Sequence, residues 1–361
     1  MSYSTESITL DVNGRPARSA SHEADLQPGE HASVSVVIPC FNEERFIGRV
    51  LENLACQYDH ERYEIIVVDG MSTDDTRKVI QEFMGRHRSL RVRVVDNPAR
   101  NIPTALNLGI RHARGEIIVR MDAHSIPSAN YVRRCVELLS GNVSVVGMPC
   151  HTQPGDDSAV ARAISLAVTH PFGVGDAKYR LANSSAQFVD TVPFGAFRKN
   201  LWEELGGFNE QLLTNEDYDF NYRVRSSGGL ILMDASAHSD YFARSRMRDL
   251  AAQYFRYGRW KAQMVKLHPR SIRWRQLVAP AFIASIVLFV ALSFWHPLAL
   301  WALLLILGAY ASLAILFALQ LSRRSFDFRL VALIPLAFLI IHGAWGSSFL
   351  LGLVRSPRSP N

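Results

Sequence analysis

Cysteine is scarce in this chain of 361 residues, and the cysteines form none of the usual clusters. Cys40, Cys56, Cys135 and Cys150 are widely spaced, without a CxxC pair or a Cys/His ligand set. Their spacing argues against a disulfide framework or a structural zinc site and fits a reducing cytoplasm. The first thirty residues also lack the apolar core of a cleavable signal peptide. We therefore expect residues 1–32 to be a flexible leader and not a signal that would export the domain after it.

Two glycine-rich phosphate-binding motifs are also absent. No GxGxxG follows the first predicted strand, and GxxxxGK[ST] occurs nowhere in the chain. A dinucleotide-dependent oxidoreductase or a P-loop enzyme would lack the backbone that cradles its phosphates. A bound diphosphate would then need another source of positive charge, usually a divalent cation held on carboxylates.

Short β-branched runs alternate with helical stretches from Ser33 to about Gly147. The predicted strands are 33–39, 63–69, 91–96 and 116–122, and the predicted helices are 43–56, 72–84, 103–113 and one starting near residue 127. Strands without polar alternation are buried on both faces, so the pattern predicts a mostly parallel α/β sheet covered by helices. Right-handed crossovers place the carboxyl ends of the strands on one edge, where such sheets bind ligands. A Gly-, Pro- and Ser-bearing region then reaches about Gly195, and helical pieces follow near 198–205 and 216–225.

A long apolar tail begins at Gln276. Polar or Pro-containing breaks divide it into runs near 277–295, 298–321 and 329–354. At 1.5 Å per residue, each run is long enough to cross a hydrocarbon core of about 30 Å. We therefore expect about three transmembrane helices within residues 276–354, followed by a tail at 355–361.

The charges beside these runs bear on orientation. With the N-terminal domain in the cytoplasm, Arg323, Arg324 and Arg329 also fall inside, as the positive-inside rule expects. Three full crossings would leave Arg355 and Arg358 outside, which conflicts mildly with that rule. A re-entrant last segment is the alternative. The sequence thus predicts a multi-pass protein of the cytoplasmic membrane with its catalytic domain facing the cytoplasm.

Basic and aromatic side chains gather just before the tail, in residues 244–275. This segment holds ten Lys and Arg residues, beginning with Arg244, against the single acid Asp249, and five aromatic residues lie among them. Such a composition is typical of a helix lying on anionic membrane lipids. The alternatives are nucleic-acid binding and a plain solvated face. Because an apolar run follows immediately, we favour membrane lipids and expect no nucleic-acid partner.

Three polar clusters carry the candidate chemistry. The first, 67–76, places Asp69 at a strand end before a Gly turn and a Ser/Thr/Asp helix start, which suits a base or ribose but also an ordinary capped turn. The second is Asp122 and His124, two potential metal ligands that a turn at 125–127 would bring onto one ion. The third is 214–219, with three acids at the start of a helix. The helix dipole accounts for one acid at this position. The functional interpretation is that one of the carboxylates is a partly buried general base. His238 is a weaker candidate for a metal or phosphate contact, and Arg244, which begins the basic segment, is a slightly better phosphate candidate.

Taken together, these segments resemble the family 2 inverting nucleotide-diphospho-sugar glycosyltransferases of GT-A fold. The resemblance runs from about Val34 to Trp260 and rests on VVIPCFNEE, VVDGMSTDDT, ALNLGIRHARGEIIVRMDAH, VPFGAFRK, GGF and TNEDYDFNYRVR in that order. With YGRWK and the apolar tail, the chain resembles the succinoglycan-type exopolysaccharide glycosyltransferases in particular. The resemblance implies a GT-A domain over residues 33–243, ahead of the interfacial segment 244–275 and the transmembrane helices.

The resemblance also implies roles for individual residues. The catalytic base is Asp217, with Glu216 as its neighbour, and the metal ligands for Mg²⁺ or Mn²⁺ are Asp122 and His124. The nucleotide pocket is lined by Pro39, Asn42, Glu43, Asp69, Arg100 and Asp122. The donor sugar and the acceptor are contacted by Phe194, Gly195, Arg198, Arg256, Arg259 and Trp260.

Two positions depart from the family pattern. His124 replaces the second acid of the DxD motif, which changes the charge of the site and its metal preference. The QxxRW motif of processive synthases is incomplete, because Gln253 is followed by Arg256 and Tyr257, and Trp260 is offset.

We therefore expect transfer of a single sugar from a nucleotide-diphospho-sugar, a UDP-sugar first, to a polyprenyl-diphosphate-linked acceptor. Such a reaction belongs to exopolysaccharide or cell-surface glycan synthesis. The alternatives are a processive polysaccharide synthase and a non-catalytic, membrane-bound nucleotide-sugar-binding scaffold.

Overall fold

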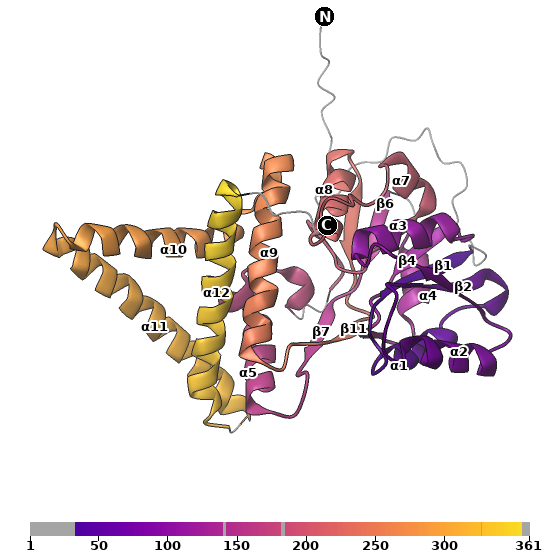
Figure 1. The fold of residues 1–361 in the computed structure, drawn as a ribbon, viewed down its shortest axis with the longest axis horizontal. Helices are drawn as coiled ribbons and strands as arrows, with labels where there is room; N and C mark the ends of the chain where they lie inside the picture. The colour runs from indigo at the N-terminus through magenta and orange to yellow at the C-terminus, as the bar shows by residue number, and fades with distance from the viewer. Residues whose placement is uncertain (1–32, 140–141, 182–184, 326, 356–361) are drawn as a thin grey trace, which may run out of the picture.

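The computed structural model describes residues 33–139, 142–181, 185–325 and 327–355. The leader expected at 1–32 and residues 356–361 of the expected tail lie outside the described residues. Figure 1 shows a part built around a β-sheet from the first two thirds of the chain, and beside it a helical part formed by the last third.

The main sheet has eight strands in the order β3-β2-β1-β4-β9-β6-β10-β8. The pairs β1–β2, β1–β4, β2–β3 and β6–β10 are parallel, whereas β9 runs antiparallel to both β4 and β6, and β8 antiparallel to β10. The strands are β1 (Val34–Cys40), β2 (Tyr63–Asp69), β3 (Arg91–Asp96), β4 (Ile117–Arg120), β6 (Val143–Gly147), β8 (Gln187–Phe188), β9 (Ala196–Arg198) and β10 (Leu230–Met233). The predicted mostly parallel α/β sheet is confirmed.

Helices cover both faces of this sheet. On one face, α1, α2 and α4 pack on the side chains of Val36, Ile38 and Ile65; on the other, α3, α7 and α8 pack on Val37 and Ile66. The helices are α1 (Ile47–Ala55), α2 (Thr76–Arg86), α3 (Ile102–His112), α4 (Tyr131–Leu138), α7 (Lys199–Glu204) and α8 (Glu216–Ser226). This double cover explains why β1 and β2 read as unbroken apolar runs.

The strand at 91–96 differs from the expectation of burial on both faces. Because β3 forms one end of the strand order, Val94 is exposed while Val92 is buried. The sequence Arg-Val-Arg-Val already shows the polar alternation of a half-buried edge strand.

The region between Gly147 and Gly195 is more regular than its composition predicts. From this region, β7 (Cys150–Gln153) joins a second sheet in the order β5-β11-β7, whose other strands, β5 (Ser125–Pro127) and β11 (Ser239–Phe242), lie outside it. Strand β7 is followed by α5 (Ala159–Val168) and α6 (Pro171–Val174). Ser158 caps α5 by accepting a hydrogen bond from the Ala161 amide at 3.1 Å. From the sequence we predicted no helix at 159–168, although the N-cap serine of α5 was a readable signal.

The helical part consists of α9 (Met247–Leu267), α10 (Trp274–Ser293), α11 (Pro297–Ser325) and α12 (Leu330–Val354), with short 3₁₀ turns elsewhere at His60–Arg62, Lys178–Arg180 and Pro269–Ser271. Three of these helices, α10, α11 and α12, are long and apolar enough to cross a membrane. They match the three apolar runs read from the sequence. A third apolar core joins α5 and α9 to α11 and α12 through Ile164, Leu250, Ala318 and Phe338.

The buried amide of Asn107 ties α3 to the loop that precedes α8. Its Nδ2 donates to the Phe208 carbonyl at 2.9 Å, and its Oδ1 accepts from the Phe208 amide at 2.8 Å and from Trp202 Nε1 at 3.2 Å. Without the Asn107 amide, the Phe208 backbone groups and Trp202 Nε1 would be buried without these hydrogen bonds. We expect Asn107→Ala to lower the free energy of unfolding by about 2–4 kcal/mol.

The matched control is Asn53→Ala, which removes an exposed amide that donates to the Arg49 carbonyl of the same helix. Thermal unfolding of both variants in detergent measures the effect. Equal melting temperatures for the two would contradict a structural role of Asn107.

Candidate active site

Strained backbone marks the edge of the sheet where the parallel strands end. Among the described residues, five that are not glycine have positive φ: Asn42, Met71, Arg100, Phe194 and Asn215. The first three follow β1, β2 and β3, Phe194 precedes β9, and Asn215 precedes α8. Such conformations persist only where the surrounding structure enforces them, and they concentrate at functional sites. The strain therefore points to this edge as the site.

The residues predicted for the nucleotide pocket form a hydrogen-bonded group at the ends of β1 and β2. Asn42 Oδ1 accepts from the Thr73 amide at 2.8 Å, and the Asn42 amide donates to Ser72 Oγ at 2.9 Å. The fully buried Asp69 carboxylate accepts from the Ser72 amide at 3.1 Å and pairs with Arg77 Nε at 2.6 Å. Pro39 lies one residue before the end of β1. Asp69 therefore already has a partner for its charge.

Two carboxylates contact one buried arginine at the end of β4. Arg120 lies 2.9 Å from Glu216 Oε1 and 3.4 Å from Asp122 Oδ1, and its side chain is 6% exposed. Its Nε and Nη1 are buried without a hydrogen-bond partner. The guanidinium also lies over the Phe194 ring, 5.8 Å from its centroid. A single cation thus offsets several acids and keeps unused donors, which leaves room for a further ligand.

The two acids at the start of α8 differ in their contacts. Glu216 is buried against Arg120, whereas Asp217 is half-buried and its Oδ1 accepts from the Tyr218 amide at 2.7 Å. Burial raises the pKa of both carboxyls, and the positive charge of Arg120 only partly offsets it. A carboxylate with a raised pKa near a reacting hydroxyl is suited to general-base catalysis.

The third acid of this cluster, Asp219, has a structural role. It is fully buried, pairs with Arg223 Nε at 2.8 Å one turn along α8, and its other oxygen lies 2.9 Å from His268 Nε2. The second contact fixes the end of α9 to α8. The acids at 214–219 therefore have two different sets of partners, which reduces their mutual repulsion. Glu216 pairs with Arg120, and Asp219 pairs with Arg223 and His268.

His124 is oriented by a carboxylate. Its Nδ1 lies 2.8 Å from Glu43 Oε1, an arrangement that leaves Nε2 as the ring atom for a cation. Burial opposes protonation of this ring, but the hydrogen bond to Glu43 and the charge of Asp122 outweigh it, so the pKa of His124 is raised. Metal-binding histidines commonly donate their second N–H to a carboxylate in this way. The donor set and the uncompensated acids nearby fit a divalent cation.

A cavity of about 840 Å³ connects these groups to the apolar helices. It is lined by Asp122, Glu216 and Asp217 and also by residues of α10, α11 and α12. Its lining further includes five basic side chains: Arg180, Arg244, Arg256, Lys261 and Arg275. The Lys261 ammonium lies 3.5 Å from the centroid of the Tyr218 ring, and burial lowers the pKa of Lys261 to about 7.

The cavity contains some of the residues predicted from the sequence and excludes others. Arg100, Asp122, His124, Phe194, Glu216, Asp217 and Arg256 line it. Gly195 follows Phe194 at the start of β9, where a Cβ would lie 2.8 Å from Val145 Cγ1. Arg198 is turned away from the cavity and donates to the Leu139 carbonyl at 3.0 Å. Arg259 and Trp260 line a separate groove on α9 of about 500 Å³. These last three have no contact with the cavity that would support a role in catalysis.

Arg120 is the main site residue that the sequence analysis missed. Its signal was a single charged side chain inside the apolar strand Glu-Ile-Ile-Val-Arg, where charge is buried only with a partner. Arg180, Tyr241 and Lys261 were also missed, and they carry no comparable signal because distant segments bring them to the cavity.

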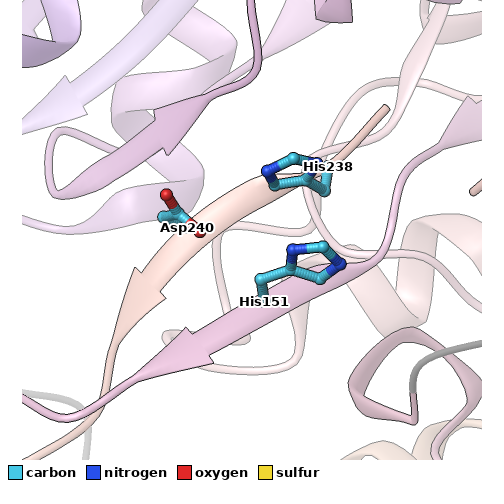
Figure 2. A group of neighbouring side chains, drawn as sticks. All are labelled: His151, His238 and Asp240. Carbon is cyan, nitrogen blue, oxygen red and sulfur yellow. The ribbon is translucent and has the colours of Figure 1, made fainter. Parts of the chain in front are cut away.

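A second group of potential metal ligands lies on the three-stranded sheet. His151 of β7, His238 and Asp240 of β11 place their ligand atoms within 4.8 Å of one another (Figure 2). The two imidazole rings are stacked, with centroids 4.0 Å apart and planes 19° apart. Stacked rings direct their in-plane lone pairs side by side, so one ion could bind both only after a ring turns. The group differs from the Asp122 and His124 pair that the sequence predicted.

With this geometry established, comparison with known proteins defines the class. Residues 35–205 match the family model described as glycosyl transferase family 2. Two curated relatives extend the similarity. One is the succinoglycan biosynthesis protein ExoA of Rhizobium meliloti (strain 1021), 28% identical over 275 residues, which are 74% of this chain and 82% of that protein. Residues 35–205 of this chain are thus similar to the family 2 glycosyltransferases.

The second relative is a dolichyl N-acetyl-alpha-D-glucosaminyl phosphate 3-beta-D-2,3-diacetamido-2,3-dideoxy-beta-D-glucuronosyltransferase of Methanococcus voltae. It is 27% identical over 247 residues, covering 67% of this chain and 76% of that protein.

The solved structure of a mannosyltransferase, PcManGT from Pyrobaculum calidifontis in complex with GDP-Man and Mn²⁺, covers 90% of each chain with a TM-score of 0.58 at 20% identity. The likeness shows the GT-A-like fold followed by apolar helices. The chain is a glycosyltransferase with three C-terminal helices able to span a membrane.

Arg120 should set the pH at which the carboxylates lose activity. Because burial raises their pKa and Arg120 lowers it, Arg120→Met should raise the pKa of Glu216 and Asp217 further. A base is lost when it is protonated, so turnover should fall off at a higher pH than in the wild type as the solution is acidified.

The measurement is the pH profile of turnover at saturating substrates. Arg134→Met is the matched control, because Arg134 pairs with Asp234 at 2.7 Å away from the cavity. The same acid limb in Arg120→Met and in the control would contradict this role.

Proposed function

We propose that this glycosyltransferase moves one sugar from a nucleotide-diphospho-sugar, with UDP as the first nucleotide to test, to a polyprenyl-diphosphate-linked sugar at the cytoplasmic face of a membrane. The observation that carries the proposal is the cavity that joins Asp122, Glu216 and Asp217 to the membrane helices. Apolar side chains of α10 to α12 in the cavity lining suit a polyprenyl chain, and the basic side chains of the same lining suit phosphates.

The proposed chemistry is a single displacement. Asp217 accepts the proton of the acceptor hydroxyl, whose oxygen attacks the anomeric carbon. As that bond forms, the bond from the anomeric carbon to the diphosphate oxygen breaks, and the nucleoside diphosphate leaves with both electrons. The anomeric configuration is inverted. Asp217 is favoured over Glu216 because Glu216 is buried in its pair with Arg120.

Asp122 and His124 are the residues that would hold a divalent cation, Mg²⁺ or Mn²⁺. When bound, the ion would neutralise the diphosphate as it departs. Glu43 orients the His124 ring, so its role in the proposal changes from a nucleotide contact to support of the metal site. Support for a cation is the crowding of Asp122, Glu216 and Asp217 around one arginine.

The proposal agrees with what the relatives are named for. The Methanococcus voltae protein is named as a transferase to a dolichyl-phosphate-linked sugar, and the Rhizobium meliloti protein for succinoglycan biosynthesis. Another relative, from Pseudomonas savastanoi pv. phaseolicola, is named as an undecaprenyl-phosphate transferase and is 30% identical over 160 residues, 43% of this chain and 47% of that protein. A lipid-linked acceptor is shared by two of these names.

The direct experiment incubates the purified full-length protein with a panel of nucleotide sugars and polyprenyl-diphosphate-linked sugars. Release of nucleoside diphosphate that depends on both substrates supports the proposal. Addition of one sugar per acceptor supports single transfer, whereas products of increasing length would identify a processive synthase. Binding without turnover across the panel would favour a non-catalytic scaffold.

Replacing the proposed base tests the chemistry. Asp217→Asn should lower turnover by about two to four orders of magnitude while leaving donor binding nearly intact, because only proton transfer is lost. Turnover and donor affinity are measured on the same preparation. Turnover close to the wild type in Asp217→Asn would show that Asp217 is not the base. Glu216 would then be the candidate, and Glu216→Gln should show the loss of turnover.

Replacing the carboxylate behind His124 tests the metal site. Glu43→Gln should raise the metal concentration needed for half-maximal activity by about 10–100-fold, the usual cost of losing such a support. The neighbouring Glu44→Gln is the matched control, since Glu44 accepts from the Asp75 amide at 3.0 Å instead. Equal metal titrations for the two variants would remove Glu43 and His124 from the metal site, and full activity in chelator would remove the ion itself.

A further inference from the structure

The last apolar helix, α12, packs against α9 along its length. It runs side by side with α9 (Figure 1). A Cβ on Gly258 of α9 would lie 2.3 Å from the Trp345 carbonyl oxygen, and a Cβ on Gly352 of α12 would lie 2.7 Å from Ala262 Cβ. Gln263 Nε2 donates to the Gly352 carbonyl at 3.0 Å. Two helices in such close backbone contact share one orientation relative to a membrane.

Helix α9 cannot lie across a hydrocarbon core. It carries Arg248, Arg256, Arg259 and Lys266, and a charged side chain at the centre of a bilayer is costly. Its C-terminal end is also held by the contact between His268 and Asp219 of α8. If α12 crossed the membrane, α9 and part of the active site would be drawn in with it.

Helix α12 is tied to the catalytic part on a second side. At its start, Asp327 pairs with Arg162 of α5 at 2.7 Å. In its middle, His342 Nε2 lies 2.8 Å from the Phe172 carbonyl oxygen of α6. In the most apolar stretch of α12, 33% of the residues are buried inside the protein. The buried share of the corresponding stretch is 11% in α10 and 17% in α11. The helix is therefore less available to lipid than the other two.

Helices α10 and α11 run in a different direction. Figure 1 shows them extending away from α12 and meeting at a turn on the side opposite the catalytic part. At this turn, the side chains of Phe294 and Trp295 are 79% and 80% exposed. With 20 residues, α10 is about 30 Å long, which matches the hydrocarbon thickness. The longer α11 returns obliquely, as a tilted span requires.

We propose that only the α10–α11 hairpin crosses the bilayer, while α12 lies along the membrane surface with α9 behind it. The chain then crosses twice, and its C-terminal end returns to the side of the catalytic domain. Arg323, Arg329 and Arg355 all fall on that side, which removes the charge conflict that three crossings create.

A groove between α9 and α12 fits this arrangement. Phe255, Arg259 and Trp260 line this groove of about 500 Å³ together with Ala344 of α12. Arginine and aromatic side chains beside an apolar helix are typical of segments at the headgroup level of a bilayer. The partner of this surface is the anionic lipid headgroup layer.

Cysteine labelling in intact and permeabilised cells tests the proposal without any activity assay. Cys56 of the full-length protein is exposed and free, and the other cysteines are buried, so Cys56 reports the side of the catalytic domain to a membrane-impermeant maleimide. In a Cys56→Ser background, Arg355→Cys and Val354→Cys report the end of α12, and His296→Cys reports the α10–α11 turn. Cys56→Ser alone measures the background, and labelling in detergent shows that each thiol reacts.

The expected result is that Arg355→Cys and Val354→Cys are labelled under the same condition as Cys56, and His296→Cys under the opposite condition. Labelling of both α12 positions together with His296→Cys would establish a third crossing and overturn the proposal. Labelling of His296→Cys together with Cys56 would show that the hairpin does not cross, and would overturn it equally.

Discussion

The site depends on one buried cation. Arg120 stands at the end of a central strand between Glu216 and Asp122, within an enclosure where unpaired carboxylates would be costly to bury. Its pairing allows the start of α8 to approach the end of β4, which brings Asp217 into the same cavity as Asp122. One guanidinium faces several acids, so the positive charge of Arg120 does not neutralise all the negative charge of the cluster. The remaining negative charge is what a divalent cation and a departing diphosphate would use.

A second constraint couples this site to the membrane. Helix α9 begins after β11, ends at the His268–Asp219 contact, and lies against α12 in between. One helix therefore touches the catalytic cluster, the basic wall of the cavity and the apolar helices. Under the proposed function, this arrangement presents the site to an acceptor held in the bilayer rather than to one diffusing in solution. The strain at Phe194 and Asn215 lies at the same junction.

The sequence predicted those features that depend on local pattern. Four strand–helix pairs, the apolar runs and the convergence of Asp122 with Asp217 followed from periodicity and from the family motifs. The His124–Glu43 pair did not, because 81 residues separate its members and only the fold unites them. The packing of α12 on α9 was equally hidden, since hydropathy measures how apolar a helix is and not what covers it. Arg120 was readable as a charge within a buried strand, but its partners were not.

A single displacement leaves its mark on the stereochemistry of the product. A donor that supports turnover would be labelled with ¹³C at the anomeric carbon, and the configuration of the new linkage would be read by nuclear magnetic resonance on the isolated lipid product. A single displacement assisted by Asp217 predicts the configuration opposite to that of the donor. Retention of the donor's configuration would require a different course of reaction and would contradict the account.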